Sequence, residues 1–286
     1  MDTHDGGVSD HVYEVDGRDI TIGDKVEDPI ITTSDHYQTS DINRALVHEV
    51  LRLAGFGGKK VDLIVTLPVE TFFRASKREE KKAHILKPVT HANNQPLAII
   101  ERVRVAPEAV PVLDAICLDN KGQAIPEFQD IQKVMIVDIG GTTTDISIVN
   151  FENDVEARKS VSIGVFNIAS QLKDLIQNDP NINARNPNDN TIDLTLRSGN
   201  FRKDTDVSHH IDHACNQITG KLLAAMNALY SDPDDLDYVV YVGGGAYLLA
   251  SKLSKQYGGN TLSFENPEYA VALGLLRNEL NQTETA

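Results

Sequence analysis

One stretch near the middle of the chain, MIVDIGGTTTDISIV at residues 135–149, limits the possible folds more than any other. An apolar run reaches an acidic residue, two glycines and three threonines follow, and the chain then becomes apolar again. Two apolar runs separated by a short glycine-containing turn predict two strands that pair as a β-hairpin. We therefore expect Asp138 at the end of a buried strand, beside a turn without bulky side chains.

That turn has the chemistry of a phosphate and magnesium site. A carboxylate at the end of a buried strand needs cations or hydrogen-bond donors, and Asp138 could hold Mg²⁺ through water. Glycine lets the backbone approach a ligand closely, and successive N–H groups in such a turn form a concave anion site. A tight hairpin turn with an acidic rim is the structural alternative. The candidate ligand-binding residues are Asp138, Gly140, Gly141, Thr142, Thr143 and Asp145.

A second glycine turn follows about a hundred residues later, in YVVYVGGGAYLLASKL. Largely apolar strand residues lead into Gly243, Gly244 and Gly245, and a helix is predicted to begin near Ala246. Three glycines at a strand-to-helix junction let a nucleotide lie on the backbone, with phosphate near the helix N-terminus. A simple strand-to-helix turn would also fit this pattern, so alone it is a weaker signal than the first turn.

A third candidate is Glu108, in the segment VAPEAVP beyond a predicted strand. It could be a surface charge, or an acid in the first turn of a helix, where the helix dipole favours it. As a general base it would have to reach a water molecule in line with the terminal phosphate of a nucleotide.

The overall charge argues against several functions. The chain of 286 residues has 27 basic and 42 acidic residues, a formal net charge of -15. Such a field repels nucleic acid and anionic membranes, so we expect no direct contact with either. Two cysteines are too few for a disulfide framework, and no stretch reaches the ~20 apolar residues of a membrane helix. These features favour a cytoplasmic protein.

Two further clusters could carry chemistry. His209, His210 and His213 in SHHIDH have helical spacing and could bind a metal, but a surface helix start beside Asp206 and Asp212 is the preferred interpretation. The basic run from Lys77 to Lys82 could contact DNA phosphates, but a solvated helix face with paired charges explains it better.

Together, the three motifs resemble those of the actin-like ATPases, and the ParM/StbA plasmid-segregation branch fits best. IVTLPVETFFR at residues 64–74 and SIGVFNIASQLKD at residues 162–174 are also similar to that branch. The resemblance implies an α/β, two-lobed actin-like (ribonuclease H-like) fold with ATP and Mg²⁺ in a cleft between the lobes. It places the first lobe at residues 1–133 and the second at 134–266. A C-terminal helix, about residues 267–286, would pack back on the first lobe.

The resemblance also implies roles for the candidates. Asp138 would organise Mg²⁺ and its waters, Glu108 would position the hydrolytic water, and Gly140 to Thr143 would line the β- and γ-phosphates. Gly243, Gly244, Gly245 and Ala246 would form the adenosine loop. Members of this branch assemble into filaments in the ATP-bound state, and hydrolysis destabilises the filaments. A ParR-like centromere-binding adaptor couples the filament to a plasmid.

The family pattern begins with a strand hairpin that carries a first phosphate loop, and this chain does not show it. Only MDTH precedes Asp5-Gly6-Gly7, without an apolar strand. We therefore expect an incomplete first lobe, and little or no ATP hydrolysis by this chain alone. A small-molecule kinase of the same superfamily and a non-catalytic remnant that binds or caps filaments are the alternative functions. The sequence leaves the choice between ATP and GTP open.

Overall fold

The computed structural model describes residues 11–23 and 36–284. The described chain forms two compact units, one within residues 1–67 and 71–106 and the other within residues 68–70 and 107–286. These compact units are not the lobes predicted above, and the lobe boundary between residues 133 and 134 stays a prediction. The expected absence of a first phosphate loop concerns residues 1–10, which lie outside the described residues.

The first unit contains two small sheets and two longer helices. Its opening hairpin, β1 (His11–Val15) and β2 (Arg18–Ile22), turns at Asp16 and Gly17, which both have positive φ (50° and 78°) as that dipeptide predicts. The two sheets have the orders β2-β1-β4 and β3-β5. The remaining elements are β3 (Lys60–Leu67), β4 (Thr90–His91), β5 (Ile99–Pro107), α1 (Asp41–Leu53) and α3 (Ala75–Ile85).

The interior of the first unit is unusually polar. Tyr13 Oη donates to Glu49 Oε2 at 2.5 Å, and burial, followed by Glu49, raises the pKa of the tyrosine. The buried ammonium of Lys81 donates to two oxygens of Gln38 and to Asn43 Oδ1. Lys81 belongs to the predicted basic run, so part of that run is not a solvated helix face. These hydrogen bonds connect α1 and α3 with the segment before α1.

The second unit is built on a five-stranded sheet of order β12-β11-β6-β7-β8. The hairpin predicted around residues 135–149 is present, because β6 pairs with β7 antiparallel, and β8 continues this arrangement. Strand β11 pairs with β6 and β12 in parallel. The strands are β6 (Lys133–Ile139), β7 (Thr144–Asn150), β8 (Val155–Val161), β11 (Tyr238–Val242) and β12 (Thr261–Leu262).

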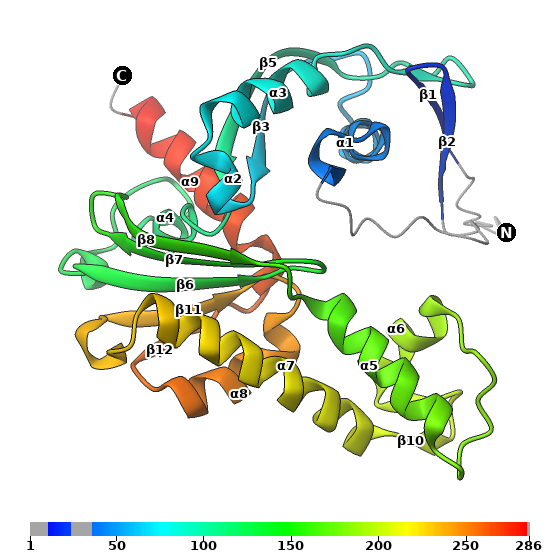
Figure 1. Ribbon diagram of the computed structural model, residues 1–286. Helices are drawn as coiled ribbons and strands as arrows, with labels where there is room; N and C mark the ends of the chain where they lie inside the picture. The colour runs from blue at the N-terminus through cyan, green and yellow to red at the C-terminus, as the bar shows by residue number, and fades with distance from the viewer. Residues whose placement is uncertain (1–10, 24–35, 285–286) are drawn as a thin grey trace, which may run out of the picture. The chain divides into compact units, whose positions relative to one another are not determined.

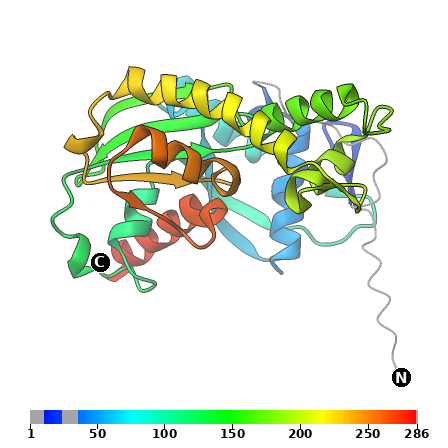
Figure 2. The same cartoon turned by 90° about the horizontal axis from the view of Figure 1, so that it is seen from below.

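Helices cover both faces of this sheet (Figure 1). Alternate residues of β6 face opposite sides: Met135 and Val137 join a core with α5, α7 and α8, whereas Val134 and Ile136 join a core with α4 and α9. Figure 2 shows α7 and α8 together on one side of the strands. The helices are α4 (Val112–Cys117), α5 (Val165–Asn178), α6 (Asp189–Ser198), α7 (Ser208–Leu229), α8 (Ala246–Tyr257) and α9 (Ala270–Glu284).

Helix α9 packs along α4, and this contact depends on Gly274. A β-carbon at Gly274 would lie 1.7 Å from the carbonyl oxygen of Pro111. Asn278 Nδ2 donates to Asp114 Oδ2 at 3.0 Å, and Arg277 donates to the carbonyl oxygen of Ala115. The two helices therefore meet backbone to backbone. Among the described residues, no helix has the length and apolar character needed to cross a membrane.

Candidate functional site

Two carboxyl groups lie directly opposite each other at the end of the β6–β7 hairpin. Asp138 of β6 is the register partner of Asp145 of β7, and like charges opposite each other in a sheet repel. Burial and then the charge of Asp145 raise the pKa of Asp138 to about 7, although a hydrogen bond from the Ala109 N–H lowers it. Folding therefore disfavours the ionised form of Asp138.

Asp145 is buried and has several partners within the second unit. Its Oδ1 accepts hydrogen bonds from the backbone N–H of Val69, the first residue of α2 (Val69–Phe72), at 2.8 Å and from Ser160 Oγ at 2.5 Å. Burial raises its pKa, although these hydrogen bonds and one with Glu108 oppose the shift. Two carboxyl groups can share a hydrogen bond only if one of them carries a proton. The carboxyl groups of Glu108 and Asp145 thus lie within hydrogen-bonding reach of each other, beside Asp138.

A strained turn brings Glu108 to this position. Ala109 is fully buried and has φ of 67°, which is uncommon for a residue with a side chain. The N–H of Val110 donates to the carbonyl oxygen of Glu108 at 2.9 Å, so three residues close the turn. This turn directs the Ala109 N–H to Asp138 and the Glu108 side chain to Asp145. Backbone strain of this kind is concentrated at functional sites.

The turn from Gly140 to Thr143 has backbone N–H groups that can donate hydrogen bonds to a ligand. The carbonyl oxygens of Gly140 and Gly141 accept hydrogen bonds from the N–H groups of Val165 and Phe166 at the start of α5, at 3.0 and 2.9 Å. Within the described chain, the N–H groups of Gly141 and Thr142 have no hydrogen-bond acceptor. The first N–H groups of α5 thus occupy the two carbonyl groups, while the N–H groups of Gly141 and Thr142 are available to an anion.

The close contact between this turn and α5 requires Gly164, which the sequence analysis did not single out. A β-carbon on Gly164 would lie 2.5 Å from the Gly141 carbonyl oxygen and 2.6 Å from that of Gly140. Gly164 precedes an amphipathic helix and caps it, since its N–H donates to Asn167 Oδ1 at 2.8 Å. A glycine directly before a predicted helix was the available signal.

The three-glycine turn packs against the end of β6 beside Asp138. Gly243 has φ of 80°, and a β-carbon there would lie 2.5 Å from Asp138 Oδ1 and 2.5 Å from the carbonyl oxygen of Ile139. The N–H of Gly245 donates to that same carbonyl at 2.8 Å. Gly244 has no atom within 4 Å of a β-carbon position. Packing therefore explains two of the glycines, and the third faces open space before α8 begins at Ala246.

This asymmetry gives a matched pair of substitutions. We expect Gly243→Ala to lower the free energy of unfolding by about 2–3 kcal/mol, from its positive φ and its clash with backbone. Gly244→Ala should change it by less than about 0.5 kcal/mol. Urea denaturation of the two variants measures the difference. Equal urea midpoints for the two variants would show that Gly243 does not pack against Asp138 at this distance.

The second unit thus brings together every site residue that the sequence predicted: the acidic group at Glu108, Asp138 and Asp145, and the glycine turns on either side. The histidines predicted as an alternative metal site are elsewhere, at the start of α7. The sequence analysis missed the turn at Ala109 and the contacts of Val69 and Ser160, because their partners are distant in the chain.

The fold of the second unit, together with this arrangement of turns, defines an actin-like protein. The family model for the plasmid segregation protein ParM, N-terminal domain, matches residues 2–116. The model for the archaeal actin homologue MreB-like, C-terminal domain, matches residues 136–255. The N-terminal part of the chain is thus similar to ParM, and the C-terminal part is similar to an archaeal actin homologue.

Solved structures support the fold at low sequence identity. An archaeal actin homologue, Ta0583, in complex with ADP has 19% identity and a TM-score of 0.74, over 96% of this chain and 89% of that chain. A 15-stranded ParM filament from Clostridium botulinum has 18% identity and a TM-score of 0.71, over 96% and 85% of the two chains. A non-polymerisable mutant of pCBH ParM has 16% identity and a TM-score of 0.74, over 96% and 86%. No curated protein matches the sequence.

Proposed function

We propose that this chain is an actin-like filament subunit for plasmid segregation, whose assembly depends on ATP and Mg²⁺. The observation that carries the proposal is the desolvated Asp138 carboxyl group, which lies beside Glu108 and Asp145 and next to the two glycine turns. Similarity to a ParM filament and to an actin homologue in complex with ADP supports assembly and nucleotide binding.

The donor set fits magnesium and phosphate. Carboxylate oxygens and water are the ligands that Mg²⁺ prefers. A cation would compensate the charge of the desolvated Asp138 carboxylate. The N–H groups of Gly141 and Thr142 would bind phosphate oxygens, with the hydroxyl groups of Thr142 and Thr143 as further donors. Bound magnesium would neutralise phosphate charge.

The other two acidic residues, Glu108 and Asp145, would position the water molecule that attacks the phosphate. Glu108 would orient the attacking water, and Asp145 would position Glu108 through the hydrogen bond between their carboxyl groups rather than contact the nucleotide itself. The three-glycine turn and Ala246 would support the adenosine. We propose a ParR-like adaptor as the link to the plasmid, because the net charge of -15 disfavours direct contact with DNA.

Sedimentation tests this function. We expect the purified chain to move into the pellet with ATP and Mg²⁺, and to stay in the supernatant with ADP or without nucleotide. A calorimetric titration with ATP and Mg²⁺ on the same sample measures binding separately. Binding with no sedimentation under any nucleotide condition would contradict the filament function, and phosphate transfer to a small acceptor would instead indicate a kinase.

A further inference from the structure

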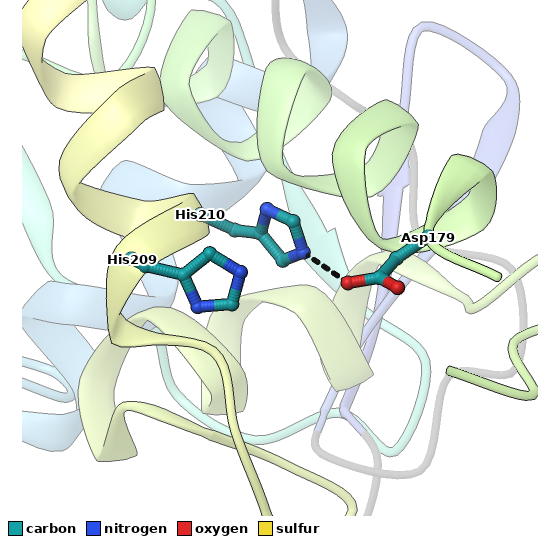
Figure 3. Close-up of side chains that lie close together, drawn as sticks. All are labelled: Asp179, His209 and His210. Carbon is teal, nitrogen blue, oxygen red and sulfur yellow. Dashed lines mark hydrogen bonds and ion pairs between the residues drawn. The ribbon is translucent and has the colours of Figure 1, made fainter. Parts of the chain in front are cut away.

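A cluster of three metal-ligating side chains lies away from the acidic site, where the end of α5 meets the start of α7. Asp179 is the first residue after α5, and His209 and His210 are in the first turn of α7. His210 Nε2 and Asp179 Oδ2 are 2.8 Å apart, and the centres of the two imidazole rings are 3.9 Å apart. Figure 3 shows the three side chains facing one another.

The spacing of these groups is close to that of a zinc site. One ligand atom from each residue lies within 4.8 Å of the other two. Zinc bonds of 2.0–2.1 Å in a tetrahedron put ligand atoms roughly 3.3 Å apart. Side-chain rotation would close the longer separations, and the His210–Asp179 pair would open by about half an ångström. Two imidazoles and one carboxylate favour zinc over the oxygen-preferring Mg²⁺ and Ca²⁺.

We propose that Asp179, His209 and His210 bind Zn²⁺ and thereby fasten the end of α5 to the start of α7. The carboxylate is already oriented for this role, because Asp179 Oδ1 accepts hydrogen bonds from the backbone N–H and the side-chain amide of Asn181, at 2.8 and 3.1 Å. Such outer contacts leave Oδ2 directed at the imidazoles and hold a ligand in place.

The site also has room for a fourth ligand. His209 is exposed, whereas Asp179 and His210 are partly buried. A surface hollow of about 430 Å³ adjoins the cluster, and the residues that line it are Asp174, Leu175, Asn178, Asp179, Pro180 and His210. Water can therefore complete the coordination that three protein ligands leave open.

The role of His209 distinguishes a metal site from a simple contact between helices. An ion pair between His210 and Asp179 would hold the two helices together without His209. The sequence analysis grouped His213 with His209 and His210, but His213 Nε2 lies 2.9 Å from Gln217 Nε2, further along α7. Side chains at neighbouring positions on a helix usually point apart. The packing of the His209 ring on the His210 ring therefore supports a shared ligand for the two histidines.

The test uses the untagged full chain, treated with a chelator and studied without nucleotide, which would itself bind metal. We expect calorimetry with ZnCl₂ to give one site per chain that is at least tenfold weaker in His209→Ala and Asp179→Asn. Zinc should also raise the melting temperature of the wild type by several degrees. His213→Ala, a neighbouring exposed histidine, should behave like the wild type. Bound Co²⁺ should give the visible absorption of a four-coordinate site.

Two results would overturn the proposal. One is that the wild type binds no zinc at 100 μM. This concentration is about ten to a hundred times the dissociation constant expected for a specific site. The other is equal binding by the wild type and His209→Ala, which would place the ion elsewhere. His11 Nδ1 and His91 Nε2 in the first unit, 3.1 Å apart, are one such place, and ions bound there would persist in His209→Ala.

Discussion

Asp138→Asn is expected to make the nucleotide-free protein more stable and to weaken its binding of ATP and Mg²⁺. The pKa of Asp138 rises from 3.8 to about 7 on folding, through burial and the charge of Asp145. A raised pKa means that folding works against the ionised form, by about 1.4 kcal/mol per pK unit. Removing the charge should therefore raise the free energy of unfolding at pH 8 by about 2–4 kcal/mol.

The pH dependence has a definite sign. Between pH 4 and 7 the folded protein holds a proton on Asp138 that the unfolded chain has lost, so wild-type stability should fall as pH rises through this range. The raised pKa of Asp145 acts in the same direction. Urea denaturation at several pH values should show a smaller fall in Asp138→Asn. A variant less stable than the wild type at pH 8 would contradict the assignment.

Binding should change in the opposite direction. Contacts of a charged group contribute about 1.5–3 kcal/mol, so loss of the carboxylate should weaken ATP·Mg²⁺ binding by about 10- to 150-fold. Calorimetric titration measures this, and Asp130→Asn, at an exposed position shortly before β6, is the matched control. Unchanged affinity in Asp138→Asn would move the nucleotide away from this carboxyl group.

Gly274→Ala is expected to separate α9 from α4 and to destabilise the second unit strongly. The added β-carbon would lie 1.7 Å from the Pro111 carbonyl oxygen and 3.3 Å from the Ala115 nitrogen. Both obstacles are backbone atoms, so one helix must move away. We expect a loss of about 3 kcal/mol or more in the free energy of unfolding.

The control is the same substitution in the middle of another helix. Gly220 lies in α7 with no atom within 4 Å of its β-carbon position. Gly220→Ala should stabilise the protein by about 0.5–1 kcal/mol, because alanine favours a helix over glycine. Thermal and urea denaturation of both variants measure the difference. A mild effect at Gly274 would mean that α9 does not pack on α4 at this distance.

Local patterns predicted the elements well. The hairpin at Asp16 and Gly17 and the strands that flank the first glycine turn each depend on neighbours within a few residues. So does the apolar stripe of α7, where Cys215, Ile218 and Leu222 have helical spacing and are buried. The mixed charges of residues 74–87 favour a loop and a short helix, yet residues 75–85 form one helix. There, contacts made by buried Lys81 outweigh the weak apolar pattern.

Local sequence patterns could not predict contacts between segments that are distant in the chain. The spacing of Ile42, Leu46, Val50 and Leu53 predicts one apolar face on α1. Val50 is nevertheless 62% exposed and Leu53 is 69% exposed, while Arg44 is fully buried. The pairing of Asp145 with Val69, 76 residues away, leaves no local trace in the sequence. The same holds for the positive φ of Ala109, which only the surrounding contacts impose.

The strained turn at Ala109 has a consequence for the far end of the chain. Helix α4 begins three residues later, and Gly274, Arg277 and Asn278 attach α9 to it. A short backbone segment and helix α4 therefore connect Glu108 to the C-terminal helix. We expect a dye on the outer surface of α9 to change its signal if nucleotide binding displaces Glu108.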